Sequence, residues 1–100
     1  MARHDVYKMP GGGPGYLVDV QSALLDHFAS RVVLPLEPIA RNPERLQDLN
    51  PIFDILGEPH VLLTQAIVAI PARALKRPVA SLRDQQDAIT RALDLLLTGF

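Results

Sequence analysis

Hydrophobic residues occur along this chain in short runs that glycine and proline repeatedly interrupt. Such runs favour strands, because a helix needs about ten or more residues before its period is recognisable. Gly57 lies between two of these runs and predicts a hairpin turn there. The segments that we predict as strands are residues 6–8, 16–20, 31–36, 52–56, 60–64 and 66–70, with a further edge strand around residues 73–75.

Two segments carry turn-forming or polar residues in place of a periodic pattern. Residues 10–15 read Pro-Gly-Gly-Gly-Pro-Gly, which predicts a mobile loop between the first two strands. Residues 37–51 contain three prolines among polar residues and predict a long connection with little order of its own. We expect Leu46 and Leu49 to attach this connection to the core.

In the last twenty residues the hydrophobic positions follow the spacing of a helix, and we predict a helix over residues 82–97. Ser81 and Asp84 have the spacing of a capping box, in which the serine accepts from the third backbone N–H of the helix. Gly99 lies where a C-cap is expected. The apolar positions at helical spacing are Leu82, Ile89, Leu93, Leu96, Leu97 and Phe100.

The end of this helix, residues 95–100, is apolar on more sides than a small domain can cover. A subunit interface or a partner site is therefore expected there. The whole pattern predicts one domain over residues 1–100, mainly β within the α+β class, in which several short antiparallel strands are closed by a C-terminal α-helix.

Composition excludes several classes of protein. The chain has 100 residues, of which 48% are hydrophobic, so it can form a core. It has no cysteine, which excludes a disulfide scaffold and thiolate metal sites. Ten basic and eleven acidic residues give a net charge of −1, which argues against direct binding of nucleic acid. No apolar run has the length of a membrane span and no signal peptide is evident, so we expect a cytoplasmic protein.

No catalytic constellation is visible in the sequence. His4, His27 and His60 have no second ligand at metal spacing, and we interpret them as ordinary histidines. The glycine-rich segment lacks the lysine and the Ser/Thr of a phosphate loop. The serines lack the glycine flanks of a nucleophile elbow. We therefore expect no enzyme, no metal and no cofactor.

One stretch of the sequence is basic. Between Glu58 and Asp84 there is no acidic residue, whereas four basic residues occur there: Arg73, Lys76, Arg77 and Arg83. Two interpretations stay open, a solvated edge of the domain and a docking surface for an acidic peptide.

Several motifs together resemble the CcdB toxins, the gyrase-poisoning members of bacterial toxin–antitoxin modules. In the first half they are Val-Asp-Val-Gln-Ser at residues 18–22, Leu-Leu-Asp at 24–26 and Arg-Val-Val-Leu-Pro-Leu at 31–36. In the second half, residues 49–51, 57–58 and 69–71 and the terminal helix agree in order and spacing. The resemblance implies an SH3-like small antiparallel barrel or sheet with extra short strands and a C-terminal α-helix, and a homodimer with Leu93, Leu96 and Leu97 at its interface.

The resemblance also implies a function. Such dimers bind the A subunit of DNA gyrase, trap the enzyme on cleaved DNA, are neutralised by a CcdA-like antitoxin and serve plasmid maintenance. The residues that match the gyrase-binding set are Leu24, Leu25, Asp94, Leu97, Thr98, Gly99 and Phe100. The family pattern ends Trp-Gly-Ile, whereas this chain ends Thr98-Gly99-Phe100, so the indole that can stack on an arginine is missing. We expect the antitoxin to contact the basic stretch.

Two alternatives remain open from the sequence. One is an endoribonuclease toxin of the MazF kind, which shares the same general fold but needs groups that hold RNA and transfer a proton. The other is a CcdB-like dimeric protein with lost or redirected gyrase activity.

Overall fold

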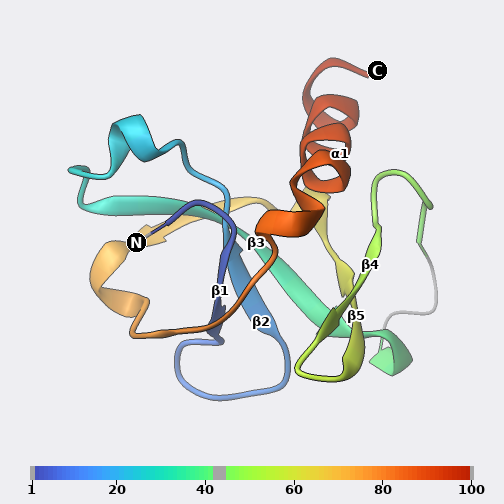
Figure 1. Ribbon diagram of the computed structural model, residues 1–100, viewed down its shortest axis with the longest axis horizontal. Helices are drawn as coiled ribbons and strands as arrows, with labels where there is room; N and C mark the ends of the chain where they lie inside the picture. Colours follow the sequence, from blue (N-terminus) through green and yellow to red (C-terminus); the bar gives the residue numbers. More distant parts are fainter. Residues whose placement is uncertain (1, 42–44, 100) are drawn as a thin grey trace.

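The computed structural model describes residues 2–41 and 45–99 (Figure 1). Within these residues the chain forms strands and one α-helix, joined by single 3-10 turns. The strands are β1 (Asp5–Lys8), β2 (Tyr16–Asp19), β3 (Ser30–Pro38), β4 (Ile52–Ile55), β5 (Glu58–Leu62), β6 (Val68–Pro71) and β7 (Pro78–Ser81). The helix is α1 (Gln86–Thr98), and the 3-10 turns are η1 (Ala23–Leu25), η2 (Ile39–Arg41), η3 (Thr64–Ala66), η4 (Ala72–Ala74) and η5 (Arg83–Gln85).

The strands form one antiparallel sheet in the order β4-β5-β3-β2-β1-β7, and β6 pairs with β3 outside this path. Strand β3 is long enough to pair with three other strands. Its first half pairs with β6 and its last residues pair with β5, while β2 lies along the other edge. The sheet curls around its centre, and α1 stands against it (Figure 1). The predicted α+β fold, an antiparallel curled sheet with a C-terminal helix, is confirmed.

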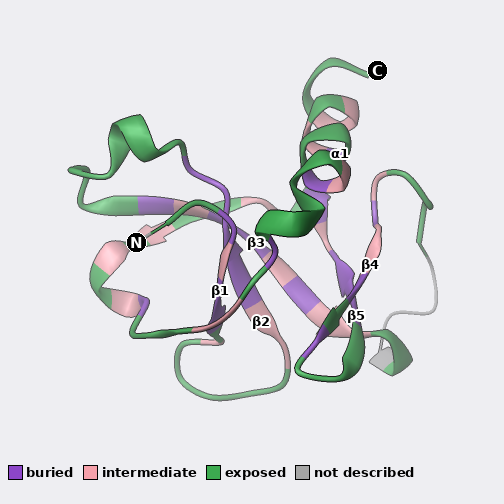
Figure 2. Ribbon diagram, in the orientation of Figure 1, coloured by how far each residue is buried: buried purple, intermediate pink, exposed green. Residues whose placement is uncertain are grey.

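The core lies on both faces of this sheet, because successive residues of a strand point to opposite sides. The main cluster includes Val6, Val18 and Leu34, and Ile89 and Ala92 of α1 cover it. The alternate positions form a smaller cluster on the other face, made of Tyr7, Leu17, Val33 and Leu75. Figure 2 shows the buried residues along the strands and at the base of α1, whereas the loops and the far end of α1 are more exposed.

The hairpin predicted at Gly57 is confirmed. Ile55 pairs with Glu58, so Leu56 and Gly57 form a two-residue loop between β4 and β5. Both residues have positive φ, 52° and 89°, as a type I′ turn requires. This turn geometry matches the twist of the flanking strands, so two residues are enough to connect β4 to β5.

The predicted edge strand around residues 73–75 is wrong. The segment is the turn η4, in which the backbone N–H of Leu75 donates to the Ala72 carbonyl at 3.1 Å. Leu75 is buried in the smaller cluster, and this anchors the turn. The strand lies further on, at β7, which begins at Pro78, a position where the missing N–H of proline is tolerated.

The helix begins later than predicted. Residues 83–85 form η5, and α1 begins at Gln86. The Ser81 hydroxyl accepts from the backbone N–H of Arg83 at 3.2 Å and not from that of Asp84, so the proposed capping box does not form as expected. The C-cap at Gly99 is confirmed, since its N–H donates to the Leu95 carbonyl at 3.1 Å.

In the long connection, the residue that holds the backbone is Asn50. Its side-chain N–H donates to the Leu62 carbonyl at 2.9 Å, and its side-chain oxygen accepts from the backbone N–H of Leu46 at 3.1 Å. The Leu46 side chain is exposed, so its expected role as an apolar anchor is wrong, while Leu49 is half-buried. In the part of the chain that the structure describes, no helix is long and apolar enough to cross a membrane.

Candidate functional site

Two of the residues expected to contact gyrase lie in η1, between β2 and β3. Leu24 is 86% exposed and Leu25 is 39% exposed. The turn is held locally, because the Ser22 hydroxyl accepts from the backbone N–H of Leu24 at 3.2 Å. An apolar side chain is thus presented to solvent from an ordered turn.

The other expected residues lie at the end of α1. Leu97 is 70% exposed, and Asp94, Thr98 and Gly99 are exposed as well. The Thr98 hydroxyl donates to the Asp94 carbonyl at 2.7 Å, so it is engaged by its own helix. Phe100 lies outside the described residues. The expectation that this chain alone does not bury the apolar helix end therefore agrees with the exposure of Leu97.

The residues expected at a dimer interface divide into two kinds. Leu93 and Leu96 are half-buried, whereas Leu97 is exposed. In Figure 1, η1 and the last turn of α1 are both in the upper part of the view but are well separated from each other. One copy of the chain therefore presents the described residues that are expected to bind gyrase as two separate patches.

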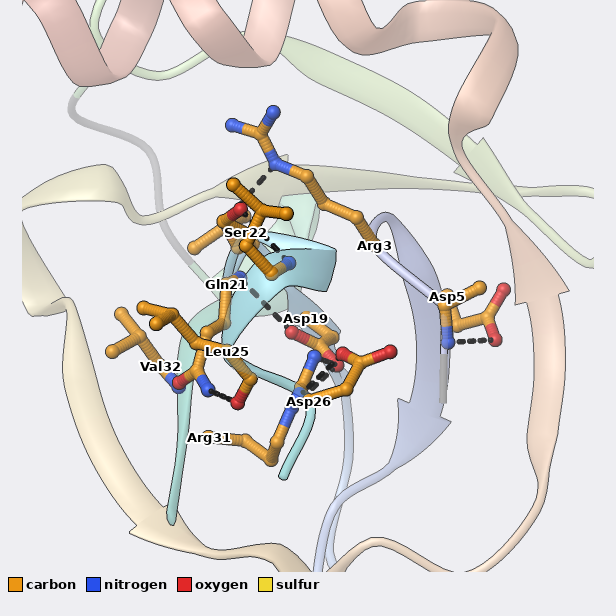
Figure 3. Close-up of polar contacts among 12 residues, drawn as sticks. Arg3, Asp5, Asp19, Gln21, Ser22, Leu25, Asp26, Arg31 and Val32 are labelled. Carbon is orange, nitrogen blue, oxygen red and sulfur yellow. Dashed lines mark hydrogen bonds and ion pairs between the residues drawn. The ribbon is translucent and has the colours of Figure 1, made fainter. Parts of the chain in front are cut away.

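A buried ion-pair network lies beneath η1 (Figure 3). Arg31, at the start of β3, and Asp19, at the end of β2, both have fully buried side chains. The Arg31 guanidinium donates to one Asp19 carboxylate oxygen from two nitrogens, at 2.7 and 3.0 Å. It donates from its third nitrogen to Asp26 at 2.9 Å, and the Asp26 side chain is 46% exposed. The network connects the loop after η1 to the sheet.

Gln21 connects the same loop to β2 and β3 through three further hydrogen bonds (Figure 3). Its side-chain amide donates to the Leu25 carbonyl at 2.9 Å and accepts from the backbone N–H of Val32 at 3.0 Å. Its own backbone N–H donates to Asp19 at 3.0 Å. The position of Leu24 and Leu25 is therefore set by buried polar contacts with β2 and β3.

Sequence reasoning did not find this network. The signal was an aspartate inside the apolar run Leu17-Val18-Asp19-Val20 and an arginine at the head of another such run, at Arg31. Burial by itself would lower the pKa of Arg31, but the hydrogen bonds and charges of Asp26 and Asp19 raise that pKa above its usual value. The guanidinium therefore stays charged throughout the working pH range.

The basic stretch does not form one surface. Lys76 and Arg77 border a groove beside Lys8. Arg73 lies by another hollow, next to Phe28. Arg83 is at the start of η5. All four cations of the stretch are exposed, but only Lys76 and Arg77 line the same groove.

An adjoining cleft, which shares Lys8 and Met9 with this groove, brings together polar groups that sequence reasoning treated as unrelated. It has a volume of about 510 Å³ and includes Lys8, Tyr16, Glu58 and His60 in its lining. The rings of Tyr16 and His60 meet edge to face, with 5.1 Å between centroids. His60 Nδ1 is 2.9 Å from the Glu58 carbonyl oxygen, so Nδ1 carries the proton and Nε2 can accept one. A proton acceptor and a cation thus share one cleft.

The other two histidines, His4 and His27, do not line this cleft. His4 is buried, and its Nε2 has no hydrogen-bond partner. The His27 ring packs edge to face on Phe28, at 4.7 Å between centroids. Among the described residues, no three carboxylates and histidines gather as a metal site would require.

Proteins of known structure share this fold. One is a mycobacterial endoribonuclease solved in complex with its cognate antitoxin, at 17% identity and a TM-score of 0.78, with 97% of this chain and 94% of that chain covered. Another is the Mycobacterium tuberculosis toxin MazF-mt6, at 16% identity and a TM-score of 0.71, with 95% of each chain covered. At these identities the likeness establishes the fold.

A match to the amino-acid sequence identifies the family. The family model of the CcdB protein matches residues 3–99. This range includes β2, η1, β3 and the terminal helix, where the motifs that resemble CcdB toxins occur. The chain therefore belongs to the CcdB family of toxins.

Proposed function

We propose that this toxin acts as a cytoplasmic homodimer that binds the A subunit of DNA gyrase, traps the gyrase–DNA cleavage complex and is neutralised by a cognate antitoxin. On this proposal it is not an enzyme, because it works by occupying another enzyme. The observation that carries the proposal is the exposure of Leu24 and Leu97 on ordered backbone, at two positions that match the gyrase-binding set of the family.

Exposure of this kind is a feature of binding surfaces. Large apolar side chains that stay in water gain free energy when a partner covers them, and a few such residues can dominate an interface. Leu24 is fixed because η1 is attached to β2 and β3 through Gln21 and Arg31. Little ordering is then required on binding, which favours affinity.

A dimer would join the separate patches. Leu93 and Leu96 offer half-buried apolar surface on α1, suited to packing against a second copy. Twofold pairing through α1 would place two helix ends side by side. The exchange of the family's tryptophan for Thr98 removes a stacking contact worth about 0.5–2 kcal/mol, so we expect weaker binding than in relatives that keep the indole.

A plasmid supercoiling assay with purified gyrase tests the proposal. Leu24→Asp and Leu97→Asp should each abolish inhibition without unfolding the protein, because both side chains are exposed. Leu56→Asp is the matched control, since Leu56 is 63% exposed in the distant β4–β5 turn. Full inhibition by Leu24→Asp and Leu97→Asp would refute the site, and a wild-type protein that neither inhibits gyrase nor binds its A subunit would refute the function.

An endoribonuclease is the second candidate, favoured by the cleft that holds Lys8, Tyr16 and His60. A lysine could hold a phosphate there and His60 could move a proton. Incubation of the wild-type protein with single-stranded RNA decides between the two. Cleavage that is lost in Lys8→Ala would replace the gyrase proposal, and intact RNA would remove the candidate. Unimpaired growth of a bacterium that expresses the chain would instead favour lost or redirected activity.

A further inference from the structure

The loop that joins η1 to β3 exposes an unusual amount of apolar side chain. Among the described residues, eight large hydrophobic side chains are exposed, and three of them, Leu24, Leu25 and Phe28, lie within five residues of each other in this loop. Phe28 is 48% exposed, whereas every other phenylalanine or tyrosine that the structure describes is buried or half-buried. Apolar side chains that gather in this way on a surface are typical of a binding site.

The Phe28 side chain is presented from ordered backbone. The backbone N–H of Phe28 donates to the Leu25 carbonyl at 3.1 Å. Its ring packs on the ring of His27 edge to face, with an angle of 90° between the ring planes. The carbonyl of Ala29 accepts from the backbone N–H of Ala72 at 2.7 Å, which attaches the loop to η4. Little order therefore has to be gained when a partner covers the ring.

Beside Phe28 lies a hollow that the loop shares with β6. Its volume is about 560 Å³, and its lining includes Ala69, Ile70 and Pro71. Arg73 is the charged residue of this lining. Both ion pairs among the described residues belong to Arg31, so Arg73 has no acidic partner among them. An apolar surface with a cation at its border complements an apolar segment that carries a carboxylate.

We propose that Phe28 is an aromatic anchor for the A subunit of DNA gyrase, and that the hollow beside it receives an apolar segment of that subunit, with a carboxylate facing Arg73. The identity of the partner rests on the proposed function. The place of contact rests on continuity, because Phe28 follows Leu24 and Leu25 in one loop and is bonded to the second of them. Phe28 is not among the residues that match the gyrase-binding set of the family, so this contact is an addition of this chain.

The anchor offsets the missing indole at a different place. Aromatic side chains contribute strongly to interfaces, because each covers a large apolar area with few rotatable bonds. The family's tryptophan would lie at position 98, at the end of α1, which is well separated from η1 in Figure 1. Thr98 offers little in its place, because its hydroxyl is bonded to its own helix. Binding by this chain should therefore depend more on Phe28 than on Thr98.

Titration of the full-length protein with the purified A subunit, followed by isothermal calorimetry, tests the anchor. Phe28→Ala should weaken binding at least about tenfold, and Thr98→Ala should weaken it less. Phe28→Tyr keeps the ring and should bind within about threefold of the wild type. Leu56→Ala is the matched control, since it truncates another exposed apolar side chain, in the β4–β5 turn, and should leave binding unchanged. Equal urea midpoints for Phe28→Ala and Phe28→Tyr show that a loss of binding is not a loss of folding.

A second pair of variants tests the carboxylate. Arg73→Glu and Arg91→Glu change the net charge equally, and both side chains are exposed, but Arg91 lies on α1 and does not line the hollow. Arg73→Glu should weaken binding several-fold, while Arg91→Glu should stay within about twofold of the wild type. Equal weakening by both would mean that net charge alone acts, and it would overturn the contact with Arg73.

The outcomes separate the anchor from the proposed function. Wild-type affinity of Phe28→Ala, with binding lost in Leu24→Asp, refutes the anchor and leaves the function standing. A wild-type protein that does not bind the A subunit refutes the function, and the anchor with it. Light scattering at one protein concentration should give Phe28→Ala the mass of the wild type. A lower mass would assign Phe28 to a contact between two copies of the chain and overturn the proposal.

Discussion

Replacing Arg31 by methionine should cost this protein a large part of its stability. The change keeps an unbranched side chain of similar length but removes the guanidinium. Among the described residues, the fully buried Asp19 carboxylate then retains only the backbone N–H of Gln21 as a donor. Removal of one partner of a buried ion pair typically costs about 3–5 kcal/mol. A domain of this size has about 5–15 kcal/mol in all, so Arg31→Met is expected to be close to unfolding.

The geometry also predicts which bonds of the network contribute most to stability. The two bonds from Arg31 to Asp19 are inaccessible to water, whereas the bond to Asp26 is partly solvated, because 46% of the Asp26 side chain is exposed. An ion pair of this exposed kind contributes at most about 1 kcal/mol. Asp26→Ala should therefore have a small effect on stability beside that of Arg31→Met.

A double variant tests the reason for the loss. Asp19→Asn in the Arg31→Met background removes the uncompensated charge and keeps an acceptor for the Gln21 amide. It should recover most of the stability that Arg31→Met loses, because the cost comes from a buried charge without a partner.

Urea unfolding followed by circular dichroism measures these differences. All variants are compared at one protein concentration, since the proposed dimer would make stability depend on concentration. The slope with urea should stay constant while the midpoint shifts. A loss of 3 kcal/mol would lower the melting temperature by about 12–24 °C. The reasoning is refuted if Arg31→Met loses no more than Asp26→Ala, or if the double variant is no more stable than Arg31→Met.

Two further predictions concern His4 and the glycine-rich loop. Burial, together with the neighbouring charge of Arg3, lowers the pKa of His4 from its usual 6.5. The unfolded chain therefore binds this proton more readily than the folded one, and stability should fall as pH drops below about 6.5. His4→Asn, which suits the positive φ of this position, should flatten the change in urea midpoint between about pH 7 and pH 5, and parallel profiles would contradict this. Gly15 and Gly12 both have positive φ, but a Cβ at Gly15 would collide with the Leu36 carbonyl, whereas one at Gly12 meets open space. Gly12→Ala should cost about 1–2 kcal/mol and Gly15→Ala clearly more, and equal urea midpoints would contradict this.

The sheet was predictable because each strand shows its pattern locally. Runs such as residues 16–20 and 31–36 are rich in β-branched and aliphatic residues. The first contains β2, and the second lies within the longer strand β3. The β4–β5 hairpin followed from the glycine at position 57. The curled sheet with one terminal helix was expected both from these patterns and from the family resemblance.

The sequence-based predictions were wrong where tertiary contacts, and not local patterns, determine the structure. Leu75 is apolar because it covers the second face of the sheet, and the strand expected around it lies instead at residues 78–81. Asn50 holds the long connection through side-chain bonds to distant backbone, which no local pattern predicts. The pairing of Asp19 with Arg31 depends on the β2–β3 register, in which Asp19 lies opposite Val33.

The same network should connect stability with function. A buried ion pair is often no more stabilising than apolar residues of similar volume, so stability alone does not account for its presence. Here the pair also fixes the loop that carries Leu24, through the bond from Arg31 to Asp26. Asp19→Asn/Arg31→Met should therefore recover stability and still inhibit gyrase less than the wild type, because that bond is lost. Asp26→Ala, which removes the same bond with little change in stability, should show the same reduced inhibition. Wild-type inhibition by both variants would mean that Gln21 alone holds the loop in place.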